Sequence, residues 1–186
     1  MTAEAGGRLF VGLAIPDDLR DGLRRHLEAT VGDRLPGRAV PAENWHLTLR
    51  FLGATDADRH RRLAAGLRTI AMPAFELSLA ALGAFPRPAR ANVLWIGVGD
   101  GPAELRMLAA AVEAVAVAAG FAAEPMAYSP HLTLSRLRPP ADVRPLVERT
   151  PAFGGRMAVD EFALFRSHLR SPTPRYEIVE RFPLLR

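Results

Sequence analysis

Apolar and polar positions along the chain predict a mixture of strands and helices. Short apolar runs bounded by Gly, Pro or charged residues predict strands, and longer stretches with an apolar residue every three or four positions predict helices. The predicted strands are Arg8–Ile15, His46–Leu52, Phe75–Leu82, Val93–Val98, His131–Arg136, Met157–Phe165 and Tyr176–Glu180. The predicted helices run from Pro16 to Ala29, from Asp56 to Ile70, from Pro102 to Gly120 and from Ala141 to Arg149.

The order of these elements indicates an α+β fold. Their short connections favour antiparallel neighbours, and the Pro- and Gly-rich turn between Phe75–Leu82 and Val93–Val98 predicts a hairpin. The second part of the chain repeats the order of the first, and no low-complexity linker divides it. We therefore expect residues 1–186 to form a single domain.

Composition excludes several kinds of chemistry. The chain has no Cys, so it cannot form a disulfide, a thiolate nucleophile or a cysteine zinc site. All 24 residues in the Lys+Arg count are Arg, which excludes Schiff-base lysine chemistry and the lysine-dependent phosphate loop. The net charge of +4 favours anionic partners, nucleic acid among them.

The sequence contains no segment that predicts secretion or membrane insertion. Charge and Gly interrupt the first apolar run early, which is not typical of a signal peptide. The Ala- and Val-rich stretch Leu108–Ala123 contains Glu113 and Gly120, so we interpret it as a helix of a globular protein. We expect a cytoplasmic monomer that has no contact with a membrane.

The tetrapeptide HLTL occurs twice, each copy in a predicted strand that follows a loop. Side chains alternate between the faces of a strand, so the imidazole and the hydroxyl of each copy share one face and the two leucines share the other. The first copy presents His46 and Thr48, and the second presents His131 and Thr133. If a pseudo-twofold axis relates the copies, all four side chains meet in one cleft.

Two imidazoles and two hydroxyls suit metal-free chemistry at a phosphodiester. A neutral His can take a proton from water while a protonated His gives one to a leaving oxygen. Thr hydroxyls can donate hydrogen bonds to the non-bridging oxygens of a phosphate. Zinc binding by the two histidines is the competing interpretation, but neither motif contains an acidic residue to complete such a site. We therefore favour proton transfer and expect no metal and no cofactor.

With these motifs the sequence resembles the two-histidine phosphoesterases, and among them the RNA 2',3'-cyclic phosphodiesterases, historically called 2'-5' RNA ligases. The motif of that family, His-x-Thr-x with x usually hydrophobic, occurs twice. The matching segments cover nearly the whole chain: RLFVGLAI, WHLTLRFLG, FPRPARANVLWIGV, SPHLTLSRL and FALFRSHLRSPTPRYEIV. The resemblance implies a bilobal fold of two antiparallel sheets, related by a pseudo-twofold axis and backed by helices, with the catalytic cleft between them.

The resemblance also implies roles for the four motif residues. His46 and His131 are the catalytic pair, and Thr48 and Thr133 bind the phosphate. His131 activates water and His46 protonates the departing 3' oxygen, so that a 2',3'-cyclic phosphate at an RNA end or on a nucleotide opens to a 2'-phosphate. The same groups can catalyse the reverse reaction, joining RNA ends through a 2'-5' linkage.

Two further residues match family positions near the substrate. Arg136 matches an Arg near the phosphate, and Phe51 matches a position that can stack on the substrate base. Strand alternation, however, places both side chains on the leucine face. Arg136 therefore reaches the phosphate only if the strand bends, and we expect Phe51 to pack in the core beside Leu47 and Leu49.

Two other functions remain open. The first is a member of the same superfamily that acts on a small nucleotide, such as a cyclic phosphate of ADP-ribose or a 2'-5' oligoadenylate. The second is a non-catalytic module that binds RNA or nucleotides. The presence of both histidines and both threonines disfavours the binding module, because binding alone needs no pair of proton-transfer groups.

Overall fold

The computed structural model describes residues 8–32, 34–168 and 174–186. In this part of the chain the strands are β1 (Arg8–Ala14), β2 (Arg38–Ala39), β3 (His46–Ala54), β4 (Phe75–Phe85), β5 (Ala91–Val98), β6 (His131–Ala141), β7 (Arg156–Val159), β8 (Glu161–His168) and β9 (Arg175–Pro183). The α-helices are α1 (Asp17–Thr30), α2 (Ala57–Leu67), α3 (Pro102–Ala118) and α4 (Arg144–Arg149). Every predicted strand and helix is therefore present. The differences are β2, which lies outside the predicted strands and helices, and the strand predicted at 157–165, which is divided into β7 and β8.

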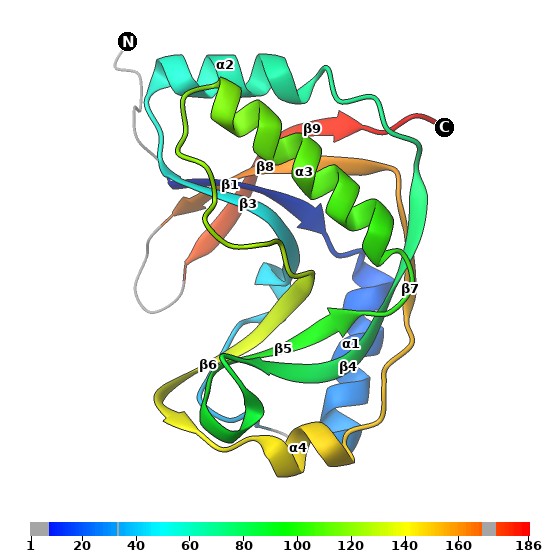
Figure 1. Cartoon of the computed structure of the whole chain (residues 1–186). Coiled ribbons are helices and arrows are strands. Elements are labelled where there is room, and N and C mark those ends of the chain that lie inside the picture. The colour runs from blue at the N-terminus through cyan, green and yellow to red at the C-terminus, as the bar shows by residue number, and fades with distance from the viewer. Residues whose placement is uncertain (1–7, 33, 169–173) are drawn as a thin grey trace.

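The strands of the described residues form one antiparallel sheet in the order β7-β4-β5-β6-β3-β1-β8-β9, and β2 pairs with β6 outside this path. The only paired residues between β3 and β6, among those described, are Leu47 and Leu132. The two expected sheets are thus the halves of one curled sheet, joined where the two HLTL strands meet (Figure 1). The α+β class and the bilobal arrangement are as predicted.

The two halves share one order of elements. Strand β1, helix α1 and strand β3 come in sequence in the first part of the chain, and β5, α3 and β6 come in sequence in the second. In the sheet, β3-β1-β8 extends to one side of the junction and β6-β5-β4 extends to the other. This correspondence agrees with the internal repeat that the sequence predicts.

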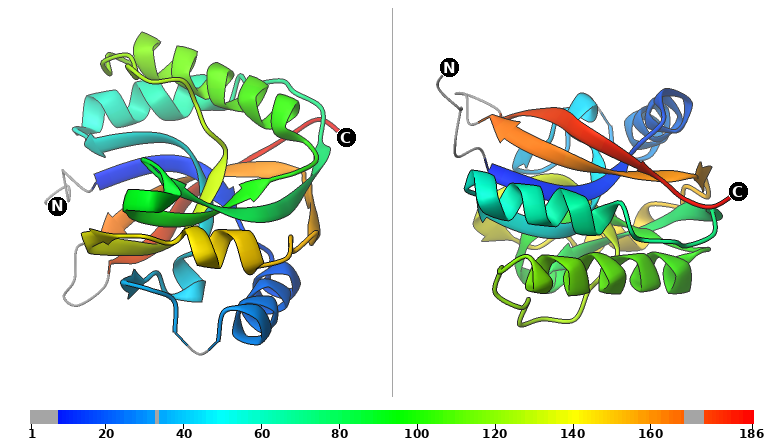
Figure 2. Two further views of the ribbon diagram at one scale, coloured as in Figure 1. Left: turned by 60° about the horizontal axis from the view of Figure 1, so that its bottom comes forward. Right: turned by 90° about the horizontal axis from the view of Figure 1, so that it is seen from above.

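The helices cover the outer faces of the sheet. Helix α3 packs against β3, and α2 packs against α3, so that the two helices lie side by side above β1 and β3 (Figures 1 and 2). Helix α1 buries Leu19, Leu23 and Leu27, spaced four residues apart on its apolar face. No helix of the described residues is long and apolar enough to cross a membrane.

The leucines of both HLTL motifs lie in the main hydrophobic core. Leu47, Leu49, Leu132 and Leu134 are all buried, together with the leucines of α1 and α3. Burial of each such side chain contributes roughly 1.5–3 kcal/mol to folding. The core therefore fixes the register of β3 and β6, and the alternate side chains of both strands point to the opposite face of the sheet.

Candidate active site

A cleft of about 340 Å³ lies at the junction of the two halves. It is lined by three side chains of β3 and by three side chains of β6, at the same positions of the two HLTL segments. These are His46, Thr48 and Phe51 in the first half and His131, Thr133 and Arg136 in the second. The structure therefore brings together all six side chains that the sequence analysis singled out.

Both imidazoles are held in the same way by the backbone. Nδ1 of His46 lies 2.8 Å from the carbonyl oxygen of Asn44, and Nδ1 of His131 lies 2.8 Å from the carbonyl oxygen of Ser129. A carbonyl oxygen only accepts hydrogen bonds, so each Nδ1 carries the hydrogen. In the neutral tautomer Nε2 is then the nitrogen with a free lone pair, available to a ligand in the cleft.

His46 lies deep among aromatic side chains. Its ring centroid is 4.7 Å from that of Phe10, 6.2 Å from that of Phe165 and 5.1 Å from the edge-on ring of Tyr176. Burial lowers the pKa of His46 to about 4; the bond to the Asn44 carbonyl opposes this shift, and the charges of His131 and Arg136 add to it. The neutral imidazole is therefore the stable form of His46 near pH 7.

His131 lies in a more open position. The ring of Phe85 meets it edge-on at a centroid distance of 4.9 Å, and Trp95 lies 6.2 Å away. Burial lowers the pKa of His131 as well; the bond to the Ser129 carbonyl opposes the shift, and the charge of Arg136 adds to it. Both histidines are thus more acidic than a free imidazole, and both respond to the same arginine.

Each HLTL strand contains a β-bulge directly after its threonine. In β3, Thr48 pairs with Gly12 and Arg50 pairs with Val11, so Leu49 is an extra residue. In β6, Thr133 pairs with Trp95 and Ser135 pairs with Leu94, so Leu134 is the extra residue there. A bulge lets two consecutive residues face the same side of a sheet and shifts the alternation beyond them by one position.

The bulges decide where Phe51 and Arg136 point. Both lie five positions after the histidine of their strand, and after the bulge this position faces the cleft. The bend that Arg136 requires is therefore present. The expectation that Phe51 packs in the core is wrong, because this residue is 59% exposed and lines the cleft. Simple alternation failed at Phe51 because the bulge adds one residue before it.

Three polar residues of the cleft were not found by the sequence analysis. Arg38 belongs to the two-residue strand β2, which is too short to show a periodic pattern. Asn44 and Tyr176 also line the cleft, but Asn44 acts on His46 through its backbone carbonyl, which every residue has. Tyr176 lies at the start of a predicted strand and in the last of the segments that carry the family resemblance, but neither signal singles out this residue.

Asn44 connects His46 to the last strand of the sheet. Its side chain is buried, and Nδ2 donates a hydrogen bond of 2.7 Å to the carbonyl oxygen of Pro174. The carbonyl of the same residue accepts the hydrogen of His46 Nδ1. The short 3-10 turn Ala42–Asn44 is thus held from two sides, which fixes the orientation of the imidazole.

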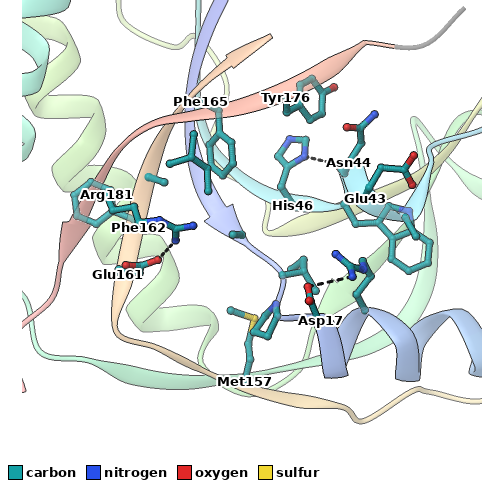
Figure 3. Close-up of a pocket in the computed structure, with 18 of the residues that line it drawn as sticks. Asp17, Glu43, Asn44, His46, Met157, Glu161, Phe162, Phe165, Tyr176 and Arg181 are labelled. Carbon is teal, nitrogen blue, oxygen red and sulfur yellow. Dashed lines mark hydrogen bonds and ion pairs between the residues drawn. The ribbon is translucent and has the colours of Figure 1, made fainter. Parts of the chain in front are cut away.

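A second cavity, of about 430 Å³, lies on the other side of His46 and shares Asn44, His46 and Tyr176 with the cleft (Figure 3). Both arginines that line it form ion pairs with acidic residues of the same cavity, Arg20 with Asp17 and Arg181 with Glu161. His131 and both threonines line the cleft between β3 and β6 instead. The cleft is therefore the candidate site for chemistry.

The cleft can carry out proton transfer beside a bound anion. It offers two imidazole Nε2 atoms, two hydroxyl donors and the guanidinium groups of Arg38 and Arg136. Zinc binding, the competing interpretation, requires at least one further ligand, and the described residues contain no group of three or more His, Asp or Glu side chains placed to hold a metal. The arrangement favours acid–base chemistry on a phosphate ester.

Comparison with known proteins agrees with this interpretation. The family model of the 2'-5' RNA ligase superfamily matches residues 14–170. The RNA 2',3'-cyclic phosphodiesterase of Aeropyrum pernix is 35% identical over 147 residues, which cover 77% of this chain and 84% of the relative. The enzyme of the same name from Escherichia coli is 32% identical and covers 95% of this chain and 96% of its own length. The crystal structure of Escherichia coli LigT complexed with 3'-AMP superposes with a TM-score of 0.80 at 30% identity, covering 97% of this chain and 99% of that one.

Proposed function

The chain belongs to the 2'-5' RNA ligase superfamily, and we propose that it is a hydrolase that opens the 2',3'-cyclic phosphate of an RNA end or a nucleotide to a 2'-phosphate. Relatives named RNA 2',3'-cyclic phosphodiesterase, at 35% and 32% identity, support this activity. The cleft with its two histidines and two threonines supports it independently, through the chemistry of these groups. We also propose that residues 1–186 act as one cytoplasmic domain. We propose that this domain is a monomer, because all six predicted side chains of the cleft come from one chain.

The histidines take opposite sides of the reacting phosphorus. Nε2 of His131 accepts a proton from water as the water oxygen bonds to phosphorus, and the bond from phosphorus to O3' breaks. Nε2 of His46 gives its proton to O3', which leaves as the ribose hydroxyl, while the phosphate stays on O2'. The two equivalent strands on either side of the Leu47–Leu132 junction support this in-line arrangement. The assignment of base to His131 and acid to His46 follows the family resemblance.

The other cleft residues bind and orient the substrate. The hydroxyls of Thr48 and Thr133 donate to the non-bridging oxygens, and Arg136 balances their negative charge. Phe51 offers an exposed ring on which the base can stack. We expect no metal and no cofactor to take part.

The low pKa of His46 constrains the mechanism. An imidazole with a pKa of about 4 is almost entirely neutral near pH 7 and cannot act as an acid. A phosphate anion beside the ring favours the charged imidazolium and raises the pKa. His46 therefore gains its catalytic proton together with the substrate, so that binding of the anion takes up a proton.

One observation carries this proposal: both HLTL motifs line one cleft, and each imidazole is fixed through Nδ1 so that Nε2 is available. The test is incubation with RNA that ends in a 2',3'-cyclic phosphate, with and without an exhaustive chelator, followed by separation of the 2'- and 3'-phosphate products. We expect the 2'-phosphate at the same rate in both conditions. Activity that is lost with chelator and returns with a divalent ion would overturn the acid–base mechanism in favour of metal catalysis.

The same assay separates the alternative substrates. The structure of Escherichia coli LigT complexed with 3'-AMP supports a nucleotide as a ligand of this chain. We expect cyclic-phosphate-ended RNA to have a higher kcat/KM than a cyclic phosphate of ADP-ribose or a 2'-5' oligoadenylate. The reverse order would favour a small-nucleotide enzyme of the same superfamily. Formation of a 2'-5' linkage from two RNA ends would show that the ligation direction is also accessible.

A further inference from the structure

Two arginines face each other across the strand pair β2–β6 at the edge of the cleft. Arg38 is the direct antiparallel partner of Arg136, and both side chains line the cleft. Directly opposite residues have their Cβ atoms about 4.5–5.5 Å apart, and like charges at such positions destabilise the sheet. The chain therefore brings two positive charges together at a cost to folding.

The backbone before Arg38 is adapted to this close approach. Gly37 has a φ of +79°, in the left-handed region that favours glycine. A Cβ atom at Gly37 would lie 2.5 Å from the carbonyl oxygen of Arg136, which is closer than packed atoms allow. The hydrogen bond of 2.8 Å from the Val40 amide to the Leu134 carbonyl continues the pairing. Glycine at position 37 thus allows β2 to lie against β6 and places Arg38 opposite Arg136.

Neither arginine is neutralised by the protein. Among the described residues, no Asp or Glu carboxylate forms an ion pair with Arg38 or Arg136, although many other arginines have such partners. The cleft residues next to the two arginines are Ala39, Val40 and Val93, which carry no charge. The pair is therefore open to an external anion.

One reacting phosphate does not account for both guanidinium groups. A cyclic phosphate diester carries a single negative charge and two non-bridging oxygens. The hydroxyls of Thr48 and Thr133 and the guanidinium of Arg136 already supply donors to both oxygens. Arg38 lies on β2, beside Arg136 and not on either strand that carries a histidine, so its guanidinium is available to a further charged group of the substrate.

We propose that Arg38 binds a second phosphate, the one attached to O5' of the nucleoside that carries the cyclic phosphate. This inference rests on the proposed function of the cleft. In RNA this group is the phosphodiester that links the last two nucleotides, and in a 5'-phosphorylated nucleotide it is a phosphomonoester. Arg38 is thus a specificity residue that distinguishes RNA ends and phosphorylated nucleotides from a bare nucleoside cyclic phosphate.

The test compares three substrates: a nucleoside 2',3'-cyclic phosphate, its 5'-phosphorylated form, and a dinucleotide that ends in the same cyclic phosphate. In the unmodified protein we expect kcat/KM to be about tenfold higher for the two substrates that carry a second phosphate, the factor that corresponds to one charge-assisted contact. Arg38→Gln should reduce this preference to near one. The dinucleotide and the 5'-phosphorylated substrate show separately whether the diester or the monoester is the group bound.

The matched control is Arg25→Gln, which removes an exposed arginine of α1 that lines neither cavity. It should leave the substrate preference and the dependence on salt unchanged. Arg38→Gln should reduce the slope of log affinity against log salt for the dinucleotide by about one unit. An equal loss for all three substrates, or no loss for any, would overturn the second phosphate site.

A binding measurement separates this inference from the proposed reaction. Calorimetry compares a nucleoside 2'-phosphate with the corresponding 2',5'-bisphosphate, and neither ligand requires turnover. We expect tighter binding of the bisphosphate to the unmodified protein and a loss of this advantage in Arg38→Gln. Retention of the advantage in Arg38→Gln would place the second phosphate on another residue. If the unmodified protein binds the bisphosphate more tightly, Arg38→Gln loses this advantage and no hydrolysis is detected, the proposed reaction is rejected and the second phosphate site is supported.

Discussion

Strands β3 and β6 have the same backbone geometry but different neighbouring side chains. Each has buried leucines, a bulge after its threonine, and an imidazole held through Nδ1 by the carbonyl two residues earlier. His46, however, lies among aromatic rings and is the more deeply buried of the two, whereas His131 is more open to the cleft. The repeated backbone therefore places the two imidazoles, and the side chains around each imidazole determine its pKa.

The residues after the bulges make the second difference. At the same position of the two strands, β3 has Phe51 and β6 has Arg136. One half of the cleft therefore offers an aromatic surface, and the other offers positive charge. A nucleotide has the same two parts, a base and a phosphate, so the asymmetry of the cleft gives the substrate one preferred direction of binding.

Removal of either imidazole is the change with the largest expected effect. His46→Ala and His131→Ala should each reduce kcat by about a hundredfold or more, the usual size of general acid–base catalysis. The measurement is turnover of a cyclic-phosphate-ended RNA under saturating substrate. The control is His60→Ala on α2, which lines neither cavity and should retain full activity. Near-normal activity in both cleft variants would remove the two-histidine mechanism.

The threonines should show a smaller effect that is similar in the two halves. Thr48→Val and Thr133→Val keep the shape of the side chain and remove one hydrogen bond to a charged group, worth roughly 1.5–3 kcal/mol. Each should therefore reduce kcat/KM by about ten- to a hundredfold, and Thr→Ser should restore most of it. A loss of kcat/KM in only one of the two variants would show that only one of the two threonines binds the phosphate.

Asn44 and Ser129 should differ, although both accept a hydrogen bond from a histidine. Asn44→Ala removes the bond to the Pro174 carbonyl and loosens the turn that orients His46, so kcat should decrease by roughly tenfold and the free energy of unfolding by about 1 kcal/mol. Ser129→Ala keeps the carbonyl that holds His131 and should change little. Steady-state kinetics and thermal unfolding of both variants measure the difference. Equal effects would show that the Asn44 side chain does not position His46.

The smallest expected effect is on the pH dependence. The reaction needs one charged and one neutral imidazole, and burial lowers the pKa of both histidines, so kcat/KM should be maximal below the ordinary imidazole pKa of about 6.5. Bound phosphate raises both pKa values, so the maximum of kcat should lie at higher pH. Arg136→Gln removes a charge that lowers both pKa values, and the maximum of kcat/KM should move upward. A downward shift of the maximum would contradict the claim that the positive charge of Arg136 lowers the pKa of both histidines.

The sequence predicts the order of elements well because the packing pattern is strong. Leu47, Leu49, Leu132 and Leu134 alternate with the reactive side chains, and this alternation alone places His46 and His131 on the open face of their strands. The repeated tetrapeptide predicts that the two faces meet. The resemblance to a known family then supplies the substrate and the roles of the side chains.

The sequence predicts less well where local geometry departs from the simple period. The bulges at Leu49 and Leu134 have no characteristic residue, because each looks like an ordinary strand leucine, and Phe51 was misplaced for this reason. Strand β2 has two residues, and Gly32–Pro41 is typical of a loop. Arg38 enters the cleft only because of the cross-strand pairing with β6, which a single sequence does not reveal.

A change of leaving group distinguishes the roles of the two histidines, His46 as general acid and His131 as general base. A nucleoside nitrophenyl phosphodiester releases an anion that needs no proton, so it makes the general acid unnecessary and leaves the general base essential. With this substrate, His46→Ala should approach the rate of the unmodified protein to within about tenfold, and His131→Ala should stay impaired by about a hundredfold or more. Recovery of activity in His131→Ala and not in His46→Ala would show that His131 is the acid and His46 the base, and would contradict the proposed roles.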